Sequence, residues 1–437
     1  MSFMAGSESK SGPCDVVVVG AGLAGKAASL QLARAGLKVT CITPPEGNPS
    51  PVGESLDWSA PDLLRNLGFS MDYLIENQMA TWKRHVTLRM RNGCSEHYIP
   101  DSWLGRPPLN IELKTLHVDR MRLDEELRKS TVAAGVTLIA DKAVGLERTG
   151  GRISAVRTAG GERISAAWFI DASGRGCLFA RELRLTKIEQ GPTKVAIWTY
   201  FPVNDPVEGT TLYMDPSPTE YLGWIWEIPV NPQTVGVGVV TTGEWMKHKR
   251  DQGLAVEAIY RQELTKFQRF EPLLAAGPAS EVNVTSFTGR VHLGVAGPNW
   301  MICGEAASMV DPITSNGVTA ALRHAAEASA LILKYRARGK VPWRARICYS
   351  SRILHMAKFF NGGIEKIVYQ PPVRTRIGLP KAGKVYTGPA WSMNVVYARL
   401  KPFGIFSTLL LNMILDTFRM SAWLLYQFSR GDGTRTP

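Results

Sequence analysis

The sequence predicts an α/β fold that contains a doubly wound parallel sheet, and three patterns carry this prediction. Residues 15–35 read as strand, glycine turn and helix, because four valines are followed at once by GAGLAG and then by apolar residues at helical spacing. Residues 37–42 (LKVTCI) form a second apolar strand pattern. Residues 185–290 alternate between apolar and polar positions, which predicts a broad second sheet interleaved with the first.

The glycine turn predicts a site for a ligand that carries a pyrophosphate. Gly20 permits the tight turn, Gly22 lets the backbone approach the pyrophosphate, and Gly25 allows close packing of helix on strand. The helix start adds free N–H groups and the positive end of the helix dipole. Folds of this kind usually carry an acidic residue after the second strand, where it binds the ribose, but Thr43 stands there. A hydroxyl binds ribose more weakly, so Thr43 is a departure from the pattern.

Length and composition narrow the class of protein. A chain of 437 residues predicts two or three interleaved domains, and 45% hydrophobic with 20% charged residues is typical of a globular protein. The net charge of +13 favours an acidic partner or a membrane surface, or serves solubility. Because the charge is scattered and no zinc-ligand spacing occurs, we expect no nucleic-acid partner and no metal site.

The cysteines and the N-terminus predict a reducing compartment. The six cysteines lie far apart without a CxxC pair, and Cys41 and Cys303 sit in apolar runs that predict buried, reduced thiols. Residues 1–13 are polar and lack an apolar signal-peptide core, so we expect a disordered leader and a cytoplasmic protein.

The elements before residue 115 are predicted from local patterns. We expect a helix over residues 60–67 that is entered through Pro61. Residues 82–90 (WKRHVTLRM) alternate and predict one strand, with Asn92-Gly93 as a hairpin turn. Residues 98–113 are rich in proline and predict irregular structure.

Further along the chain, strands and helices are expected in turn. An amphipathic helix is predicted over residues 118–136, with Met121, Leu123, Leu127 and Val132 on its apolar side. Gly150-Gly151 is expected to join two strands directly. The remaining predictions are strands at 136–140, 153–157, 168–172 and 299–303, and helices at 253–276 and 319–336.

Residues 403–428 form the most apolar segment. Asp416 and Arg419 interrupt it and leave apolar runs shorter than the roughly 20 residues that a membrane span needs. Three interpretations stay open: a packed helical cap, an interfacial helix that makes a peripheral membrane contact, and a transmembrane anchor.

Four separated motifs resemble the FAD-dependent monooxygenase superfamily, which shares a hydroxybenzoate-hydroxylase-like fold with a glutathione-reductase-like FAD domain. They are GAGLAG, the helix pattern R-x-x-L-D-x-x-L that begins at Arg120, the sequence DASG at 171–174, and the stretch from Gly304 to Gly317. The resemblance implies an FAD site whose contacts are Gly20, Gly22, Gly25, Thr43, Arg120, Ala172, Gly174, Glu305 and Pro312. In that superfamily the helix arginine reaches the pyrophosphate and an acidic residue binds the ribitol, which here is the longer Glu305. From the residue pattern alone, Arg120 fits a solvated helix face as well.

A fifth motif resembles the flavin-dependent halogenases within this superfamily. Residues 224–229 (WIWEIP) match their W-x-W-x-I-P signature, and Lys83 matches their catalytic lysine in order and spacing. Pro312, Ser315 and Gly317 match a P-x-x-S-x-G block, although Met309 replaces the phenylalanine that precedes it in the family. The resemblance implies halide binding by the backbone N–H groups of Asn316 and Gly317.

The same resemblance implies an activity and partners. Reduced FAD, oxygen and chloride or bromide would yield a hypohalous acid, which Lys83 would direct at an electron-rich carbon of an aromatic or other small molecule. Thr314 stands where tryptophan-acting halogenases carry glutamate, which resembles the phenol- and pyrrole-acting branch with its activated or carrier-protein-bound substrates. The resemblance to halogenases also implies a separate flavin reductase as partner.

Alternative interpretations stay open for the function and for single residues. The main alternative is a hydroxylase or epoxidase of the same fold that acts on an apolar, membrane-associated substrate, and a further one is a non-catalytic flavin-binding protein. Lys83 could lie on a solvated strand face, and Trp224 and Trp226 could be core residues only. His85 and His97 could be acid–base groups, although a structural role is the commoner one.

The motifs also predict domain boundaries. We expect an FAD-binding domain from residues 14–60, 115–180 and 290–335, and a substrate-binding β-sheet domain from residues 61–114 and 181–289. Residues 336–437 are expected to form a helical C-terminal region that caps the fold.

Overall fold

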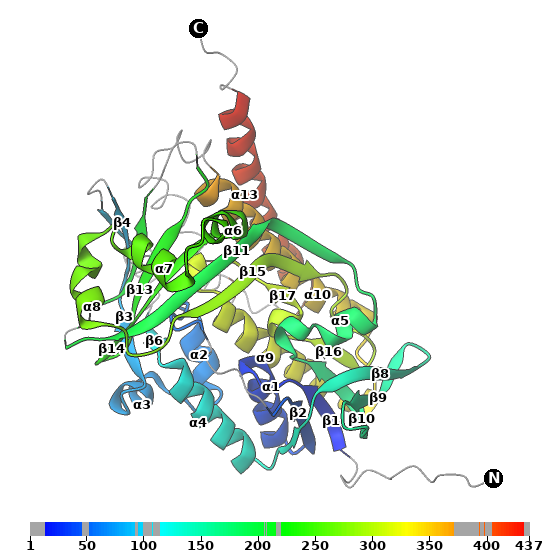
Figure 1. The fold of residues 1–437 in the computed structure, drawn as a ribbon. Helices are drawn as coiled ribbons and strands as arrows, with labels where there is room; N and C mark the ends of the chain where they lie inside the picture. Colours follow the sequence, from blue (N-terminus) through cyan, green and yellow to red (C-terminus); the bar gives the residue numbers. More distant parts are fainter. Residues whose placement is uncertain are drawn as a thin grey trace.

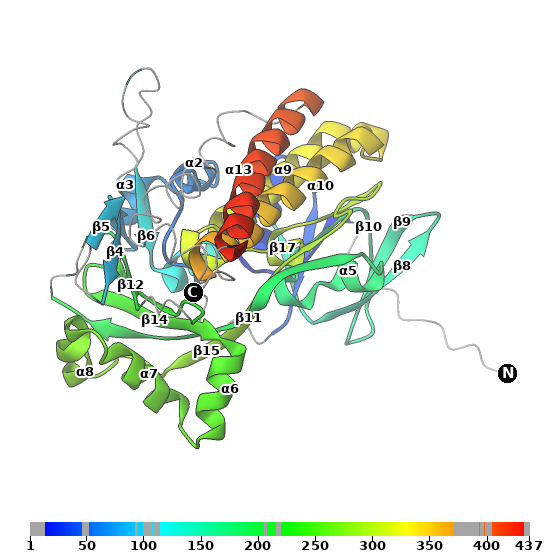
Figure 2. The ribbon, with the colours of Figure 1, turned by 90° about the horizontal axis from the view of Figure 1, so that it is seen from above.

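The computed structural model of the chain describes residues 14–45, 52–91, 95–98, 107, 114–204, 206, 208–215, 220–370, 393, 397 and 404–431. Two large sheets form the body of the protein, and C-terminal helices pack beside them (Figures 1 and 2). The α/β fold class predicted from the sequence is confirmed, with mixed sheets in place of purely parallel ones.

The first sheet has seven strands in the order β7-β2-β1-β10-β9-β8, and β16 also pairs with β10. The parallel strands are β1 (Cys14–Val19), β2 (Val39–Thr43), β7 (Thr137–Ala140), β10 (Arg163–Asp171) and β16 (Trp300–Ile302). The antiparallel strands are β8 (Ala143–Thr149) and β9 (Arg152–Thr158). The valines of β1 are buried, as expected of a parallel strand that helices cover. α1 (Leu23–Arg34) contacts β1, and α9 (Gly317–Tyr335) packs against α1 and β16.

The second sheet has eight strands in the order β17-β15-β11-β14-β13-β12-β4-β5. Neighbours are antiparallel except β12 and β4, which are parallel. The strands are β4 (Val86–Met90), β5 (Ser95–Tyr98), β11 (Lys187–Pro202), β12 (Thr210–Met214), β13 (Trp224–Asn231), β14 (Thr234–Thr242), β15 (Asn283–His292) and β17 (Ser308–Met309).

Alternation along these strands gives the second sheet two apolar faces. Ile197, Ile225 and Val237 form one core with α6 (Gly243–Asp251), α7 (Val256–Leu264) and α8 (Glu271–Ala276), which cover the outer face (Figure 2). Trp224 and Trp226 point to the other face, where they join the core of the first sheet. The inner face of the second sheet therefore packs against the part of the protein that holds the first sheet and the glycine turn.

The predicted single strand over residues 82–90 is wrong, because the structure splits it. β3 (Ala80–Lys83) pairs with β6 (Thr115–Val118) in a small antiparallel sheet, whereas β4 belongs to the large one. Arg84 and His85 lie between them, and the His85 carbonyl accepts a bond from Thr210. The predicted hairpin is supported by the antiparallel pairing of β4 and β5, while its turn at 92–93 and most of 98–113 lie outside the described residues.

Several predicted boundaries also change. The helix expected at 118–136 is α4 (Arg120–Ala133), because Val118 belongs to β6 and the Asp119 carboxylate caps the helix by accepting from the Arg122 N–H. Met121 and Val132 are exposed, contrary to prediction. The Gly150-Gly151 turn joins β9 to β8, a strand that was not predicted from the sequence.

The remaining short helices are α2 (Ala60–Arg65), α3 (Met71–Glu76) and α5 (Leu178–Glu182). The helical stretch predicted at 253–276 begins earlier than expected, because α6 starts at Gly243. α9 starts two residues before the predicted helix at 319–336 and ends one residue before it.

The described part of the C-terminal region is helical. It contains α10 (Trp343–Lys358), the π-helical turns η7 (Phe359–Gly363) and η8 (Glu365–Tyr369), and α13 (Ile405–Gly431). α13 packs against α10 and rises from the body in Figure 1. In the part of the chain that the structure describes, none of the helices has the length and hydropathy needed to cross a membrane.

Candidate active site

The glycine turn leaves a cradle at the start of α1. Gly20 has φ +96°, and a Cβ there would lie 2.4 Å from the Ala172 carbonyl oxygen. A Cβ on Gly25 would lie 1.8 Å from the Gly20 carbonyl oxygen, so both glycines are required by packing. A Cβ on Gly22 would meet no atom within 4 Å, and no side chain caps α1 at this residue. The N–H groups of this helix start therefore face a space that suits a pyrophosphate.

Three turns meet at the carboxyl ends of the parallel strands, as in other open α/β sheets that bind ligands. The Ala172 N–H donates to the Val19 carbonyl, and a Cβ on Gly304 would lie 3.1 Å from the Ala24 Cβ. The Asp171 carboxylate is buried and accepts from the backbone N–H groups of Ser173 and Phe179, at 2.8 and 2.7 Å. Burial raises the pKa of Asp171. Asp171 therefore shapes the turn that holds Ala172 and Gly174, and does not itself face a ligand.

Two predicted cofactor contacts lie at the rim of this cradle. Thr43 ends β2 and is partly buried. Glu305 is exposed and forms an ion pair with Arg175 at 3.8 Å, between two turns that pack together. Neither the Thr43 side chain nor the Glu305 side chain is fully buried by other protein groups.

Arg120 is buried, so its interpretation as a solvated helix residue is wrong. Its guanidinium donates to the Val52 carbonyl at 2.8 Å and to the Asp124 carboxylate at 3.2 Å. Lys26, which directly follows the glycine motif, donates to the Asp124 carbonyl at 2.9 Å. Burial lowers the pKa of Lys26, although the charge of Asp124 opposes this. Two cations thus lie beside the glycine turn, and Lys26 was missed because a lysine on a helix start is usually solvated.

Lys83 is buried to 1% exposure, so its interpretation as part of a solvated strand face is also wrong. Its ammonium donates to the Leu56 carbonyl at 2.8 Å and lies 4.7 Å from the centre of the Trp58 ring. Burial lowers the pKa of Lys83 to about 7, and the charge of Asp57 only partly offsets this. Near neutral pH a large fraction of Lys83 is therefore a neutral amine, which is a nucleophile.

Asp57 is the nearby acidic partner that sequence analysis did not single out. One carboxylate oxygen accepts from the Ser59 N–H and hydroxyl at 2.8 and 2.7 Å, and Arg323 donates to the same hydroxyl at 2.8 Å. Burial raises the pKa of Asp57. The pKa of Asp57 is raised and the pKa of Lys83 is lowered, so each shift favours the neutral form of its group.

A directed chain of hydrogen bonds runs from the turn before α9 to the small sheet. From the turn inward, its members are Ser315, Ser55, Thr210, His117 and Thr81, with distances of 3.1, 2.9, 2.9 and 3.3 Å. Thr81 donates its only proton to the Pro229 carbonyl, so it must accept from Nδ1 of His117. Nε2 of His117 then accepts from Thr210, and Ser315 donates at the outer end.

Neutral His117 fits this direction. Burial, together with the positive charge of Lys83, holds the pKa of His117 well below 6.5. Sequence analysis named His85 and His97 instead, and the His97 side chain lies outside the described residues. His117 was missed because nothing in the TLHV strand separates it from an ordinary buried histidine.

The predicted halide turn precedes α9. The Asp311 carboxylate accepts from the Ile313 N–H at 3.0 Å, Pro312 begins a single 3₁₀ turn, and Ser315 has the left-handed φ of +60°. Asn316 is the residue before α9, and its side chain does not cap the helix. Its side-chain amide donates instead to the Thr314 hydroxyl. A Cβ on Gly317 would meet no atom within 4 Å. This helix start has the geometry of an anion site.

The two tryptophans of the WIWEIP motif lie on the inner face of the second sheet. Their ring centres are 5.8 Å apart, and the Trp224 indole N–H donates to the Tyr369 hydroxyl at 2.9 Å. A Cβ on the facing Gly238 would lie 2.0 Å from the Trp226 ring, so that glycine makes room for the indole. Both rings are buried in the core, and Trp224 also contacts the network described next.

A second buried lysine was missed entirely. Lys194 of β11 forms ion pairs with Asp311 at 2.9 Å and Glu365 at 3.2 Å. Burial disfavours its charge, but the two carboxylates outweigh burial and raise the pKa of Lys194. Tyr369 donates to Asp311 at 3.0 Å and Tyr221 donates to Glu365 at 2.6 Å. This cluster joins the second sheet, the halide turn and η8.

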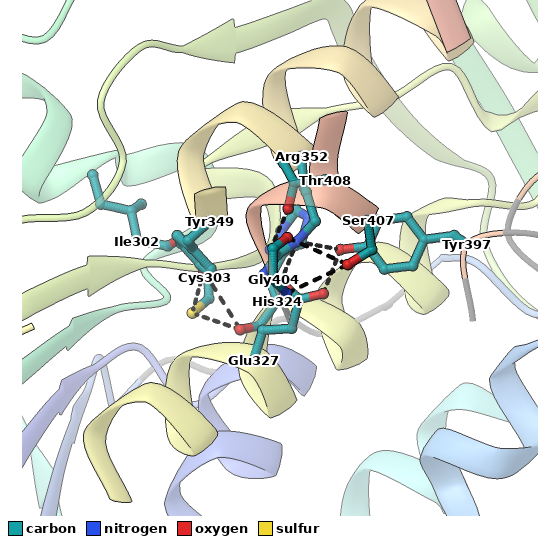
Figure 3. A network of polar contacts seen from close by, with 10 residues as sticks. All are labelled: Ile302, Cys303, His324, Glu327, Tyr349, Arg352, Tyr397, Gly404, Ser407 and Thr408. Atoms are coloured by element: carbon teal, nitrogen blue, oxygen red, sulfur yellow. Dashed lines mark hydrogen bonds and ion pairs between the residues drawn. The ribbon is translucent and has the colours of Figure 1, made fainter. Parts of the chain in front are cut away.

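A third cluster joins the C-terminal helices to α9 and to Cys303, the residue before Gly304 (Figure 3). The Gly304 N–H donates to Nδ1 of His324 at 3.2 Å, and burial lowers the pKa of this histidine to about 3. Arg352 of α10 pairs with Glu327 of α9 at 2.6 Å and donates to Thr408 of α13 at 3.2 Å. The tertiary position of α13 is thus tied to the cofactor cradle through buried hydrogen bonds.

A nucleotide cradle lies at the carboxyl ends of parallel strands, and the small β3–β6 sheet nearby carries a buried lysine of lowered pKa, a combination that is typical of an enzyme with a dinucleotide cofactor. Residues 108–336, which are more than half of the chain, match the family model described as tryptophan halogenase. The chain therefore belongs to the flavin-dependent halogenase family. Residues 15–189 also match the family model described as lycopene cyclase protein.

Individual relatives agree with this family and show its breadth. Tryptophan 2-halogenase of Chondromyces crocatus is 28% identical over 382 residues, which cover 81% of this chain and 69% of the relative. Menaquinone reductase of Mycolicibacterium smegmatis is 29% identical over 317 residues, covering 70% and 72%. A mutant of the halogenase PltM, solved in complex with FAD, shares the fold with a TM-score of 0.71 and 16% identity over 97% of this chain and 93% of its own.

Proposed function

We propose that the protein is a flavin-dependent halogenase that binds FAD in the cradle and halogenates an electron-rich aromatic or other small molecule. The observation that carries the proposal is Lys83, a fully buried amine with a pKa near 7, in a chain of the halogenase family. When bound and reduced, FAD would activate oxygen so that oxygen can oxidise the halide. The remaining chemistry falls to the residues of this chain.

The cradle supports the FAD part of the proposal. The backbone at Gly20, Gly22 and Gly25 would hold the pyrophosphate, with Arg120 and Lys26 as its cations. Thr43, Ala172, Gly174, Glu305 and Pro312 would border the rest of the cofactor. The N–H groups of Asn316 and Gly317 would hold the halide at the start of α9.

Lys83 would act as the group that carries the halogen. Its neutral amine attacks the halogen of a hypohalous acid, so that an N–halogen bond forms and water leaves after proton transfer. The electron-rich carbon of the substrate then takes the halogen, its proton is lost, and the free amine returns. Asp57 favours the protonated form, which instead donates a hydrogen bond to the oxidant. Only the neutral form would carry the halogen, so activity is expected to follow the deprotonation of Lys83.

The substrate would lie against the inner face of the second sheet, bordered by Trp224 and Trp226. Thr314 in place of glutamate supports a phenol- or pyrrole-like substrate, free or bound to a carrier protein. A separate flavin reductase would deliver reduced flavin.

The experiment supplies the purified full chain with reduced FAD, oxygen and either chloride or bromide, and offers an electron-rich phenol as acceptor. Mass spectrometry is expected to show the isotope pattern of a halogenated product. Lys83→Met should abolish this product while visible absorbance shows that FAD still binds. Lys142→Met, which removes an exposed lysine, is the matched control and should keep full activity. A product that gains one oxygen whatever the halide would contradict halogenation.

The FAD cradle has its own test, which does not depend on turnover. Gly22→Ala is expected to fold normally, because its Cβ meets no protein atom, yet to lose most of its FAD affinity. Normal FAD binding by Gly22→Ala would place the pyrophosphate elsewhere. Gly25→Ala should impair folding itself, since its Cβ would overlap the backbone.

A second candidate is a monooxygenase, such as a hydroxylase or epoxidase, that acts on an apolar and membrane-associated substrate. The apolar surface of α13 favours this candidate. It predicts oxygen insertion in the assay above and tolerance of Lys83→Met.

A further inference from the structure

Large exposed apolar side chains are concentrated on two neighbouring helices. Among the described residues, twelve of the eighteen such side chains lie on α10 and α13, and the other six are scattered. Patches of this kind mark interaction sites, whereas single exposed apolar residues do not. The members on α10 are Trp343 and Ile347, and those on α13 are Ile405, Phe406, Leu409, Leu410, Met413, Phe418, Met420, Trp423, Leu424 and Phe428.

Six of the exposed members form one stripe along α13. Phe406, which is 85% exposed, is followed at spacings of four, three, seven, four and four residues by Leu410, Met413, Met420, Leu424 and Phe428. These spacings place all six on one side of a helix. The helix has 27 residues and is therefore about 40 Å long.

The opposite side of α13 is packed and explains why the stripe stays outside. Leu411 and Leu415 are fully buried, Thr408 accepts from Arg352, and Asn412 donates to Ser351 of α10 at 2.7 Å. Figure 2 shows α13 lying beside α10. The polar bonds fix the rotation of α13, so the apolar stripe cannot turn inward without breaking them.

A basic cluster borders this surface. Lys334, Arg336, Arg338, Lys340 and Arg344 are all exposed, and no acidic residue occurs in the sequence from 328 to 364. The start of α10 adjoins the start of α13, where Trp343, Arg344 and Ile347 share the lining of a cavity of about 100 Å³ with Ile405 and Leu409. Cationic, aromatic and aliphatic side chains therefore lie together on one face.

We propose that α13 and the start of α10, together with residues 334–344, form a docking surface for an anionic lipid bilayer. α13 lies in the plane of the membrane with its stripe below the headgroups, and the basic cluster contacts the lipid phosphates. This inference goes beyond the proposed function and does not depend on it. It takes up the interfacial helix, one of the three interpretations left open for residues 403–428, and adds α10 and the basic cluster to it.

Charge selects a bilayer over a second copy of the chain. A symmetric dimer through this face would bring two basic clusters towards each other, in a protein whose net charge is already +13. An anionic membrane instead offers opposite charge along the whole border of the patch, and hydrocarbon for the stripe. Trp343, with Arg344 5.5 Å from its ring, suits the headgroup level.

The test measures binding of the full chain to vesicles of phosphatidylcholine with and without phosphatidylglycerol, by co-sedimentation. We expect binding to the anionic vesicles to be at least tenfold tighter and to weaken with salt. The triple variant Phe406→Ser, Met413→Ser, Phe428→Ser should weaken binding by about a hundredfold. Changing Arg336, Arg338, Lys340 and Arg344 to Gln should remove the preference for anionic vesicles, because each basic residue is expected to raise the affinity for them about fivefold.

The control replaces exposed apolar residues outside the patch. Tyr73, Val132 and Val284 lie on α3, α4 and β15, and changing all three to Ser should leave vesicle binding intact. Absence of wild-type binding to either vesicle would overturn the proposal, as would equal binding by the stripe variant. A dimer in sedimentation velocity that the stripe variant dissociates, without vesicle binding, would assign the surface to a second copy. Because the assay needs no flavin and no turnover, its outcome is independent of halogenation.

Discussion

Lys83 and Lys194 are two buried lysines with opposite electrostatics. Lys194 lies between two carboxylates, which raise its pKa and keep it charged. Lys83 bonds a carbonyl oxygen, and in the described part of the chain it forms no ion pair within 4 Å, so burial lowers its pKa to about 7. The difference shows that partners, and not burial alone, set the charge of a lysine. Lys194 therefore connects three elements of the fold, and Lys83 has the lowered pKa that the proposed reactive amine requires.

The largest expected effect separates the two lysines by activity. Lys83→Met should lower the rate of product formation by on the order of a thousandfold, because the group that carries the halogen is gone. Stability should stay equal or rise, since methionine fills similar space without a buried amine. Steady-state rates and thermal unfolding check this. A variant that keeps a tenth of the activity would remove Lys83 from the mechanism.

Lys194→Met should have the opposite profile. It leaves Asp311 and Glu365 buried without their cation, so we expect a loss of about 3–5 kcal/mol in the free energy of unfolding. Denaturant unfolding measures the loss. The double variant Lys194→Met with Glu365→Gln should recover part of it, and no recovery would show that packing rather than charge holds this cluster together.

The pH dependence sharpens the contrast. The neutral Lys83 amine predicts activity that rises with pH through about 7. An unfolded lysine titrates near about 10.4, so between about pH 7 and 10 the unfolded chain binds the extra proton and stability should rise with pH. Lys83→Met should remove this rise, whereas Lys194→Met should not. Activity that is flat from pH 6 to 9 would contradict a titrating Lys83.

The smallest effect concerns the hydroxyl chain beside Lys83. Thr210→Val keeps the shape but removes the donor to Nε2 of His117, which should cost about 1–3 kcal/mol of stability. Thr210→Ser keeps the hydroxyl and should restore most of it. Equal stability of the Val and Ser variants would show that this hydrogen bond contributes nothing.

Local patterns predicted much of the fold. The parallel strands around GAGLAG, the helix α9 and the apolar segment at 403–428 that forms most of α13 follow from short-range periodicity and from glycine geometry, which depend only on neighbouring residues. The family resemblance was also readable, because its motifs are short and keep their order along the chain.

The site depended on contacts that sequence patterns do not encode. Residues 82–90 alternate like one strand, yet Lys83 and Val86 belong to different sheets, because Lys83 pairs with Thr115, 32 residues further on, whereas Val86 pairs with Thr210, 124 residues further on. This split is what brings Lys83 under Leu56 and Trp58.

The sequence by itself determined the α/β class, the glycine cradle and the apolar C-terminal helix, because each is specified by spacing along the chain. Only the tertiary structure decided which lysine is neutral, where His117 lies and which side of α13 is exposed. Charge state and exposure depend on groups that folding brings together from distant parts of the chain, and a lysine looks the same in sequence whether it meets a carbonyl or two carboxylates.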